Sequence, residues 1–377
     1  MARQGDDVYR RSFQEQMELI KLPSEGSAKK YMSTRSAYTP GGDFTKDKEF
    51  PSFHGSAFGG CVYGQAALAA LRAQREVEAE EGRKPSGRLD IHTINGFFTR
   101  PGLMDKPFVY SATPLTTSRS FATMSISACH PTSSSVTDHF SPSTASLNSL
   151  QPTAFTALVS FKLPEGDSAG ISIQEPSPQE RFSSILSTRN PADWPPAPPV
   201  DVDGIVHLVG SDQAGTFPIV EMRKVDMTEY NETKPIHERR ELILYRLWKP
   251  LPANEGDGPN AHIAAHAYVA DRNGLLMAAN HLGLGWNLGK AASLSYSFVV
   301  HVNASEAVMQ GEGWWVQEAS FPRAARGRGV IESKIWSSEG LHVATEYQDG
   351  LIKSWEDGST KGIWKGGLAD AEIESKL

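Results

Sequence analysis

Two alanine-rich and mostly apolar segments constrain the fold of this chain more than any other feature of its sequence. The first runs from Ala66 to Val77 and the second from Ala261 to Ala278. Alanine and leucine favour helix, and a helix that is apolar on most of its sides has to be enclosed by other structure. Each segment is therefore predicted to be a helix buried against a sheet.

Strand-like sequence accompanies both predicted helices. Alternating apolar residues and β-branched residues favour strands. The pattern occurs once in each half, so the chain has a weak internal repeat of about 150 residues. Two sheets of this kind can pair edge to edge, which closes one open edge of each. The predicted strands cover residues 91–98, 108–112, 120–128 and 154–163 in the first half, and 217–225, 241–248, 293–302, 314–321, 329–336 and 341–353 in the second.

Composition divides the chain into five parts. Residues 1–50 are a polar lead-in, for which we expect partial order and one strand, and residues 51–165 and 216–369 are the two repeats. Residues 166–215 are crowded with proline, which favours extended backbone outside a sheet, and are predicted to be a linker. Residues 370–377 are a polar tail. Within the first repeat, the Ser, Thr and Pro of residues 131–153 predict a long mobile loop.

The overall composition excludes several classes of protein. The 377 residues are 39% hydrophobic and 21% charged, with a net charge of −7 that argues against a general nucleic-acid binder. No run reaches the roughly 18 apolar residues of a membrane span. Residues 1–15 lack the apolar core of a secretory signal. Cys61 and Cys129 are too few for a disulfide framework, so a reducing compartment is expected.

The end of the chain carries a targeting motif. The last three residues are Ser375, Lys376 and Leu377. A terminal Ser-Lys-Leu is read by the peroxisomal import receptor. The sequence therefore predicts that receptor as a partner and the peroxisome as the location.

Nine short blocks, in order from about residue 50 to residue 353, resemble the acyl-CoA thioesterase II family. Each block is short, but their order and spacing extend over both proposed repeats. In the first half they are Phe58-Gly59-Gly60 with Gln65, Phe97-Phe98-Thr99-Arg100-Pro101-Gly102, Lys106-Pro107-Phe108-Val109-Tyr110 and Arg119-Ser120-Phe121-Ala122-Thr123; in the second they are Phe217-Pro218-Ile219, residues 262–271, Ala292-Ser293-Leu294, Arg328-Gly329 and Gln348-Asp349-Gly350-Leu351-Ile352.

The resemblance implies an α+β fold of the double-hotdog type, in which two antiparallel sheets each wrap a central helix and join edge to edge. It implies hydrolysis of a fatty-acyl or related acyl-CoA to free acid and coenzyme A, without a metal or organic cofactor. It also implies an active site from the second half, made by Asp271, by Ser293 where threonine is usual, and by Gln348. Double-hotdog chains often assemble further through their sheets, so a homodimer is expected.

These residue types suit thioester hydrolysis. A carboxylate can take a proton from water, and a hydroxyl and a primary amide can orient that water. The oxyanion that develops on the substrate needs N–H donors, which the first turn of a helix presents. Gly59 and Gly60 precede the first predicted helix and are the candidates for this role, with residues 283–285 as a second candidate.

A basic cluster lies near the end of the second repeat. It contains Arg323, Arg326 and Arg328, the last followed by Gly329. Arginine is favoured for binding phosphate, so contact with the phosphates of coenzyme A is one interpretation. A solvated hairpin is the other.

Three further residues carry reactive groups. His262 and His266 are four positions apart and share a helix face, but no third ligand is evident, so no metal site is expected. Cys61 lies beside an apolar helix without a His-Asn partner pattern, and we expect it to be inert.

The chain departs from the family pattern beside the predicted site. Where the family continues with Asp-His-Ser, this chain has Ser295-Tyr296-Ser297, and Asn95 and Ser118 stand for a common histidine and a common glycine. Two alternatives stay open. One is a non-catalytic acyl-CoA binding protein on the same fold, motivated by the altered pair at 295 and 296. The other is a hotdog enoyl-CoA hydratase, although the Asp and His dyad of that class is not found.

Overall fold

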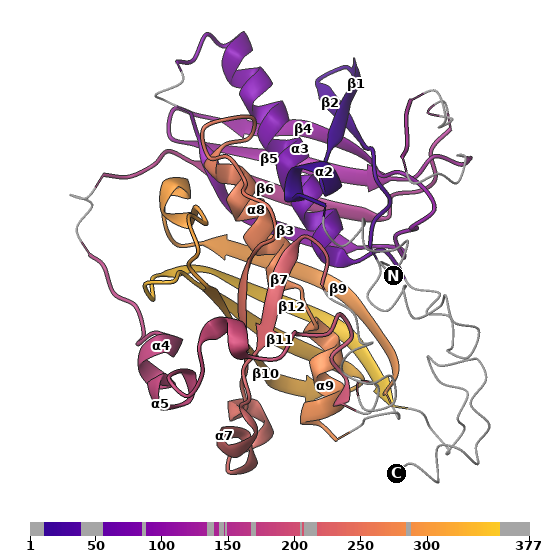
Figure 1. The fold of residues 1–377 in the computed structure, drawn as a ribbon. Coiled ribbons are helices and arrows are strands. Elements are labelled where there is room, and N and C mark those ends of the chain that lie inside the picture. The colour runs from indigo at the N-terminus through magenta and orange to yellow at the C-terminus, as the bar shows by residue number, and fades with distance from the viewer. Residues whose placement is uncertain are drawn as a thin grey trace, which may run out of the picture.

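A single antiparallel sheet organises the chain (Figure 1). The computed structural model describes residues 11–38, 56–84, 88–133, 139–142, 147, 149–166, 171–203, 206, 217–283 and 288–354. In this part of the chain the sheet has 12 strands in the order β1-β2-β4-β5-β6-β3-β9-β12-β11-β10-β8-β7. Their bounds are β1 Leu19–Glu25, β2 Ala28–Ser33, β3 Asp90–Phe98, β4 Val109–Thr117, β5 Phe121–Cys129, β6 Phe155–Lys162, β7 Val220–Lys224, β8 Glu241–Leu247, β9 Leu288–Val300, β10 Trp315–Ala325, β11 Arg328–Trp336 and β12 His342–Ser354.

The two halves of the chain meet at the pairing of β3 with β9. Thr93 lies opposite Val299, and Phe97 lies opposite Ser295, in an antiparallel register. The sheet therefore runs unbroken from the first half into the second. An edge strand of each half is covered by the other half, which removes two open edges.

Two helices lie on the same side of the sheet and contact each other. They are α3 (Gly59–Glu80) and α8 (Pro259–Ala270) (Figure 1). Every residue of α8 after Pro259 is buried, and so is nearly the whole first half of α3. The prediction that both apolar segments form enclosed helices is confirmed.

The second helix is shorter than its sequence predicted. It ends at Ala270 rather than Ala278, because Asn273 adopts a left-handed conformation with φ of 57° that a continuing helix cannot contain. A short 3₁₀ turn, η5 (Gly274–Leu276), and a separate helix, α9 (Met277–His281), follow. The turn between the two helices carries Asp271, one residue of the site described below.

Two segments expected to be irregular contain more structure than predicted. The polar lead-in forms a short helix, α2 (Phe13–Gln16), and two strands rather than one. The proline-rich segment contains α4 (Pro178–Arg181), α5 (Ser183–Leu186) and η3 (Pro191–Asp193). The remaining short helices are α7 (Thr228–Glu232), η4 (Ile236–Glu238) and η7 (Ala304–Ala307).

Several residues of these irregular segments are buried. Trp194, Val200 and Val202 of the proline-rich segment have exposed fractions of 3% or less and pack on the second half. Phe140, in the segment predicted to be a mobile loop, is also fully buried. Apolar side chains tie both segments to the folded body.

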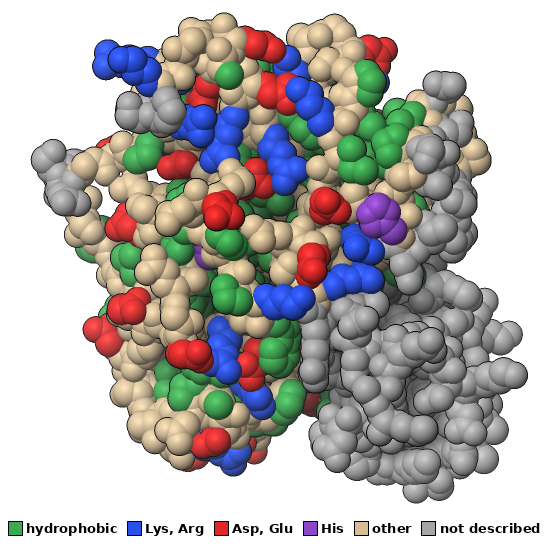
Figure 2. Space-filling model, turned by 45° about the horizontal axis from the view of Figure 1, so that its top comes forward, with side chains coloured by type: hydrophobic (Ala, Val, Ile, Leu, Met, Phe, Trp, Pro, Cys, Tyr) green, Lys and Arg blue, Asp and Glu red, His purple; other side chains and the backbone are tan. Residues whose placement is uncertain are grey.

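The surface is mixed in charge. Basic and acidic side chains are interspersed over the face drawn in Figure 2. Within the described ranges, no helix is long and apolar enough to cross a bilayer.

Candidate active site

Asp271 occupies the position directly after α8 and points back toward the start of α3. Asp271 is 6% exposed. The backbone N–H of Gly60 donates to its Oδ2 at 2.8 Å, and the side-chain amide of Gln348 donates to its Oδ1 at 2.5 Å. The carboxylate is thus held between the first turn of one helix and the end of another, more than 200 residues apart in sequence.

Ser293 and Gln348 reach the same place from two paired strands. Ser293 lies on β9 opposite Gly350 of β12, and Gln348 is two residues before Gly350, next to a bulge. Gln348 Nε2 donates to Ser293 Oγ at 2.9 Å as well as to Asp271. Both amide hydrogens of Gln348 are therefore used, and the hydrogen of the Ser293 hydroxyl is left to donate elsewhere.

The three side chains adjoin a pocket of about 390 Å³. Asp271, Ser293, Gln348 and Gly59 are all among its lining residues. Arg100 supplies the one Lys or Arg side chain among the described residues that line the pocket. The apolar lining comes from Ala57, Phe58, Phe98, Pro101, Leu275, Leu276, Ala291, Ala292 and Leu294. A pocket of this kind suits an apolar chain that ends in one polar reacting group.

Burial dominates the electrostatics of Asp271. It raises the pKa of this carboxyl from 3.8 to about 7, while the hydrogen bonds from Gly60 and Gln348 act in the opposite direction. Within the described residues, Asp271 has no ion pair with lysine or arginine. A carboxyl with a pKa near neutrality can accept a proton from water and later return it, which is what a general base requires.

Comparison with known proteins identifies the family. The model of the acyl-CoA thioesterase N-terminal domain matches residues 47–161, and that of the acyl-CoA thioesterase C-terminal domain matches residues 206–352. This chain belongs to the acyl-CoA thioesterase family. It is an acyl-CoA hydrolase, and the resemblance noted in its sequence is confirmed.

Individual relatives agree with this assignment. Human acyl-coenzyme A thioesterase 8 is 22% identical to this chain over 305 residues, which cover 78% of this chain and 80% of the relative. The crystal structure of acyl-CoA thioesterase II TesB2 from Mycobacterium marinum superposes with a TM-score of 0.58 at 21% identity, covering 92% and 99% of the two chains. A protein with a hot dog fold from Alicyclobacillus acidocaldarius gives a TM-score of 0.55 at 15% identity, with 91% and 98% covered. These structures show that the thioesterase shares their fold.

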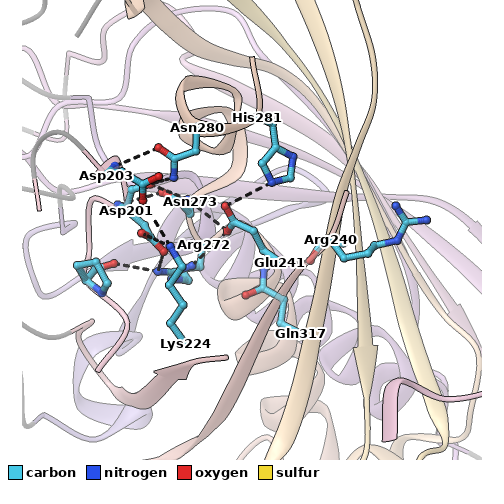
Figure 3. Close-up of polar contacts among 12 residues, drawn as sticks. Asp201, Asp203, Lys224, Arg240, Glu241, Arg272, Asn273, Asn280, His281 and Gln317 are labelled. Atoms are coloured by element: carbon cyan, nitrogen blue, oxygen red, sulfur yellow. Dashed lines mark hydrogen bonds and ion pairs between the residues drawn. The ribbon is translucent and has the colours of Figure 1, made fainter. Parts of the chain in front are cut away.

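The turn after Asp271 is held by a buried polar network that the sequence did not predict (Figure 3). Arg272 donates to Asp201 Oδ2 at 2.8 Å, and Lys224 donates to the other oxygen of Asp201 at 2.7 Å. The side-chain oxygen of Asn273 accepts from the backbone N–H of Asp201 at 3.1 Å. Asp201 belongs to the segment predicted to be a linker, where an acidic residue among prolines gives no signal of burial. This segment fixes the turn that carries Asp271.

The two glycines at the start of α3 have different surroundings. The N–H of Gly60 is occupied by Asp271, so it supports the carboxylate rather than an oxyanion. Gly59 lines the pocket, and a Cβ there would come within 2.7 Å of Asp271 Oδ2 and of the Tyr63 hydroxyl. Of the second candidate, residues 283–285, only Gly283 is among the described residues.

The predicted basic cluster lies away from the pocket. Arg328 is exposed and forms an ion pair with Asp349 on the neighbouring strand. Gly329 allows close packing, because a Cβ there would lie 2.8 Å from the ring of Phe321. Neither Arg328 nor Gly329 lines the pocket, so a role of these two residues in binding substrate stays a prediction.

The remaining residues with reactive groups are structural or undescribed. His266 contacts the Tyr245 hydroxyl at 2.8 Å and the carbonyl of Ala307 at 2.7 Å. In the ranges that the structure covers, no group of three or more His, Cys, Asp or Glu residues could hold a metal ion. Burial raises the pKa of Cys61 to about 12, which keeps it a thiol. Ser375, Lys376 and Leu377 lie outside the described residues.

Proposed function

We propose that Asp271 activates the water that hydrolyses a fatty-acyl or related acyl-CoA. The observation that supports this most is the contact of Asp271 and Ser293 with Gln348 beside the pocket. The Asp271 carboxylate takes a proton as the water oxygen bonds to the thioester carbon. The resulting oxyanion re-forms the carbonyl as the carbon–sulfur bond breaks, and the proton on Asp271 passes to the coenzyme A thiolate. Free acid and coenzyme A are the products.

In this mechanism Ser293 donates a hydrogen bond to the oxygen of the attacking water. Its own oxygen already accepts from Gln348, which orients the hydroxyl and leaves its hydrogen free. The orientation of the Gln348 amide is set by Asp271, because the reversed amide would put its oxygen 2.5 Å from an ionised carboxylate. The trio is thus oriented as a unit before substrate enters.

Arg100 is proposed as the contact for the anionic coenzyme A portion of the substrate. It is exposed, and it is the cation that the pocket presents. Arginine donors match phosphate oxygens in geometry and charge. Arg100 therefore replaces Arg328 as our first candidate for this contact, since Arg328 is paired with Asp349 and lies outside the pocket lining.

The finer description of the fold and the location of the enzyme are part of the proposal. We assign residues 51–165 and 216–369 as two hotdog domains, supported by the separate match of each half and by the helix and sheet that each contains. The terminal Ser-Lys-Leu supports import into peroxisomes. Phe97 and Leu158, 58% and 48% exposed on the sheet, support further assembly into a homodimer.

A non-catalytic acyl-CoA carrier is the second candidate. It is favoured by Tyr296, which stands where the family pattern has histidine and stacks on Tyr63 with ring centroids 3.5 Å apart. A carrier would bind acyl-CoA through the same pocket but would not release coenzyme A.

Release of coenzyme A separates the two candidates. Purified protein is incubated with palmitoyl-CoA and a thiol reagent, and turnover above the background rate supports hydrolysis. Asp271→Ala is expected to keep the fold and to lower turnover by about a hundredfold or more, the scale of losing a general base. Glu312→Ala is the matched control, because the Glu312 side chain is 94% exposed. Binding without release, or full activity in Asp271→Ala, would refute the proposed mechanism.

A further inference from the structure

A buried hydroxyl that has no hydrogen bond of good geometry with the described residues lies beside the proposed catalytic trio. It belongs to Tyr63, in the first part of α3, which has an exposed fraction of 0%. Its oxygen has no hydrogen-bond partner of good geometry among the described residues. An unsatisfied polar group in the interior is destabilising by about 1–3 kcal/mol and therefore requires an explanation.

The ring of Tyr63 is held firmly. It stacks on Tyr296 with centroids 3.5 Å apart and an interplanar angle of 20°. It also packs against Phe98 and Phe155 with centroids 5.5 Å and 5.8 Å away. The position of the hydroxyl is thus determined by aromatic packing rather than by a hydrogen bond of its own.

This packing places the hydroxyl near Asp271. The Tyr63 oxygen and Asp271 Oδ2 each lie 2.7 Å from the point that a Cβ on Gly59 would occupy. The two oxygens are therefore separated by no more than twice that distance. Ser293 and Gln348 are close enough to act on the Tyr63 hydroxyl as well, and both lower its pKa.

The other groups that face Asp271 are weaker candidates for stabilising its charge. Cys61 comes from α3, Tyr296 from β9 and Glu346 from β12, and burial raises the pKa of each of them. The Tyr296 hydroxyl already donates to the carbonyl of Ala267 at 3.2 Å. Glu346 is buried with neither oxygen hydrogen-bonded, and as a second carboxylate it would oppose the charge on Asp271. The Tyr63 hydroxyl, by contrast, is a neutral group that lies on the same side of Gly59 as Asp271 Oδ2.

We propose that Tyr63 is a positioning residue. Its hydroxyl dipole stabilises the ionised form of Asp271 at the edge of the pocket. The inference rests on the proposed role of Asp271 as the base. The Gly60 N–H and the Gln348 amide fix the orientation of the carboxylate by hydrogen bonds, and the Tyr63 hydroxyl adds a dipole on the side of α3. A dipole interacts more strongly with a charged group than with a neutral one, so the ionised carboxylate gains more from the hydroxyl than the protonated one does.

The test is the pH dependence of kcat in Tyr63→Phe. This change removes the hydroxyl and keeps the ring that stacks on Tyr296. The acidic limb of the profile, expected near the Asp271 pKa of about 7, is expected to move upward by about one pH unit. KM stays unchanged, and kcat returns to the unaltered value at the alkaline plateau. The melting temperature is expected to stay the same or to rise, because an unsatisfied buried hydroxyl has been removed.

Tyr296→Phe is the matched control. It removes a hydroxyl from the other ring of the same stack, but one that is bonded to Ala267. We expect a lower melting temperature and an acidic limb that does not move. A limb that stays in place in Tyr63→Phe, or that moves equally in both variants, would overturn the proposal.

Asp271→Asn, assayed in parallel, distinguishes failure of the proposed base from failure of the proposed role of Tyr63. If Asp271→Asn retains full activity, the proposed base is wrong and the role of Tyr63 is wrong with it. If Asp271→Asn is inactive while the limb of Tyr63→Phe is unmoved, only the inference about Tyr63 is refuted.

Discussion

Replacing the Asp271 carboxyl by its neutral isostere is expected to stabilise this enzyme, by an amount that grows as the pH rises from about 4 to about 7. Burial raises the pKa of Asp271 from 3.8 to about 7. The folded state therefore binds this proton more tightly than the unfolded state does. By linkage, the free energy of unfolding falls as pH rises from the unfolded pKa to the folded one, and stays reduced above it.

The magnitude follows from the distance between the two pKa values. A separation of about three pH units corresponds to about 4 kcal/mol of unfolding free energy, since each unit is worth about 1.4 kcal/mol. Asp271→Asn removes this loss. The asparagine has one acceptor for the two donors at Gly60 and Gln348, so the Gln348 amide has to reverse, at a cost of about 1 kcal/mol. The net gain is expected to be about 3 kcal/mol above neutral pH.

Urea denaturation at a series of pH values measures this difference. The stability of Asp271→Asn relative to the unaltered enzyme should be about zero or slightly negative below the unfolded pKa of 3.8, and should rise to its full value through pH 7. Glu312→Gln, the same type of change at an exposed carboxylate that pairs with Arg246, is measured beside it as a control. A flat or falling difference in Asp271→Asn would show that the carboxyl is not held at a raised pKa, and the argument from its burial would be wrong.

Three further predictions concern the pocket and the subcellular location of the protein. Gly59→Ala should abolish turnover and lower the melting temperature, because the new Cβ would lie 2.7 Å from Asp271 Oδ2; an active variant would show that the start of α3 is free to shift. Arg100→Ala should raise KM for an acyl-CoA about tenfold and leave KM for an acyl-pantetheine without phosphates unchanged, whereas Arg328→Ala should alter neither; equal effects on both substrates would exclude a phosphate contact. Deleting Leu377 should leave activity intact and retain a fluorescent fusion in the cytosol, where persistent peroxisomal puncta would contradict the targeting motif.

The enclosing sheet could be predicted because its strands obey local rules. The alternation in β5 and β6, and the apolar run of α8, reflect burial that repeats at fixed intervals along the chain. The end of α8 could not be predicted in the same way. The apolar pattern continues past Ala270, and the helix stops because Asn273 turns left-handed against a distant segment that its side chain binds.

The residues of the site also include some that the sequence predicted and some that it did not. Asp271, Ser293 and Gln348 were predicted from family-like blocks, and the structure brings their side chains into contact, while their catalytic role awaits the tests above. Tyr63 was missed, because it sits in a run whose pattern is explained by burial alone. Nothing local distinguishes a buried tyrosine that faces a carboxylate from one that faces the core.

The network around Arg272 explains how the proposed base, Asp271, can have a pKa near neutrality although an arginine directly follows it in the sequence. A guanidinium beside Asp271 would favour its ionised form and lower its pKa, which would weaken it as a base at neutral pH. The fold directs the Arg272 side chain instead to Asp201 and the carbonyl of Pro198. Asp201, in turn, is supplied by the proline-rich segment between the two matched domains. That segment supports the turn that carries Asp271, because its carboxylate pairs with the arginine that directly follows the proposed base.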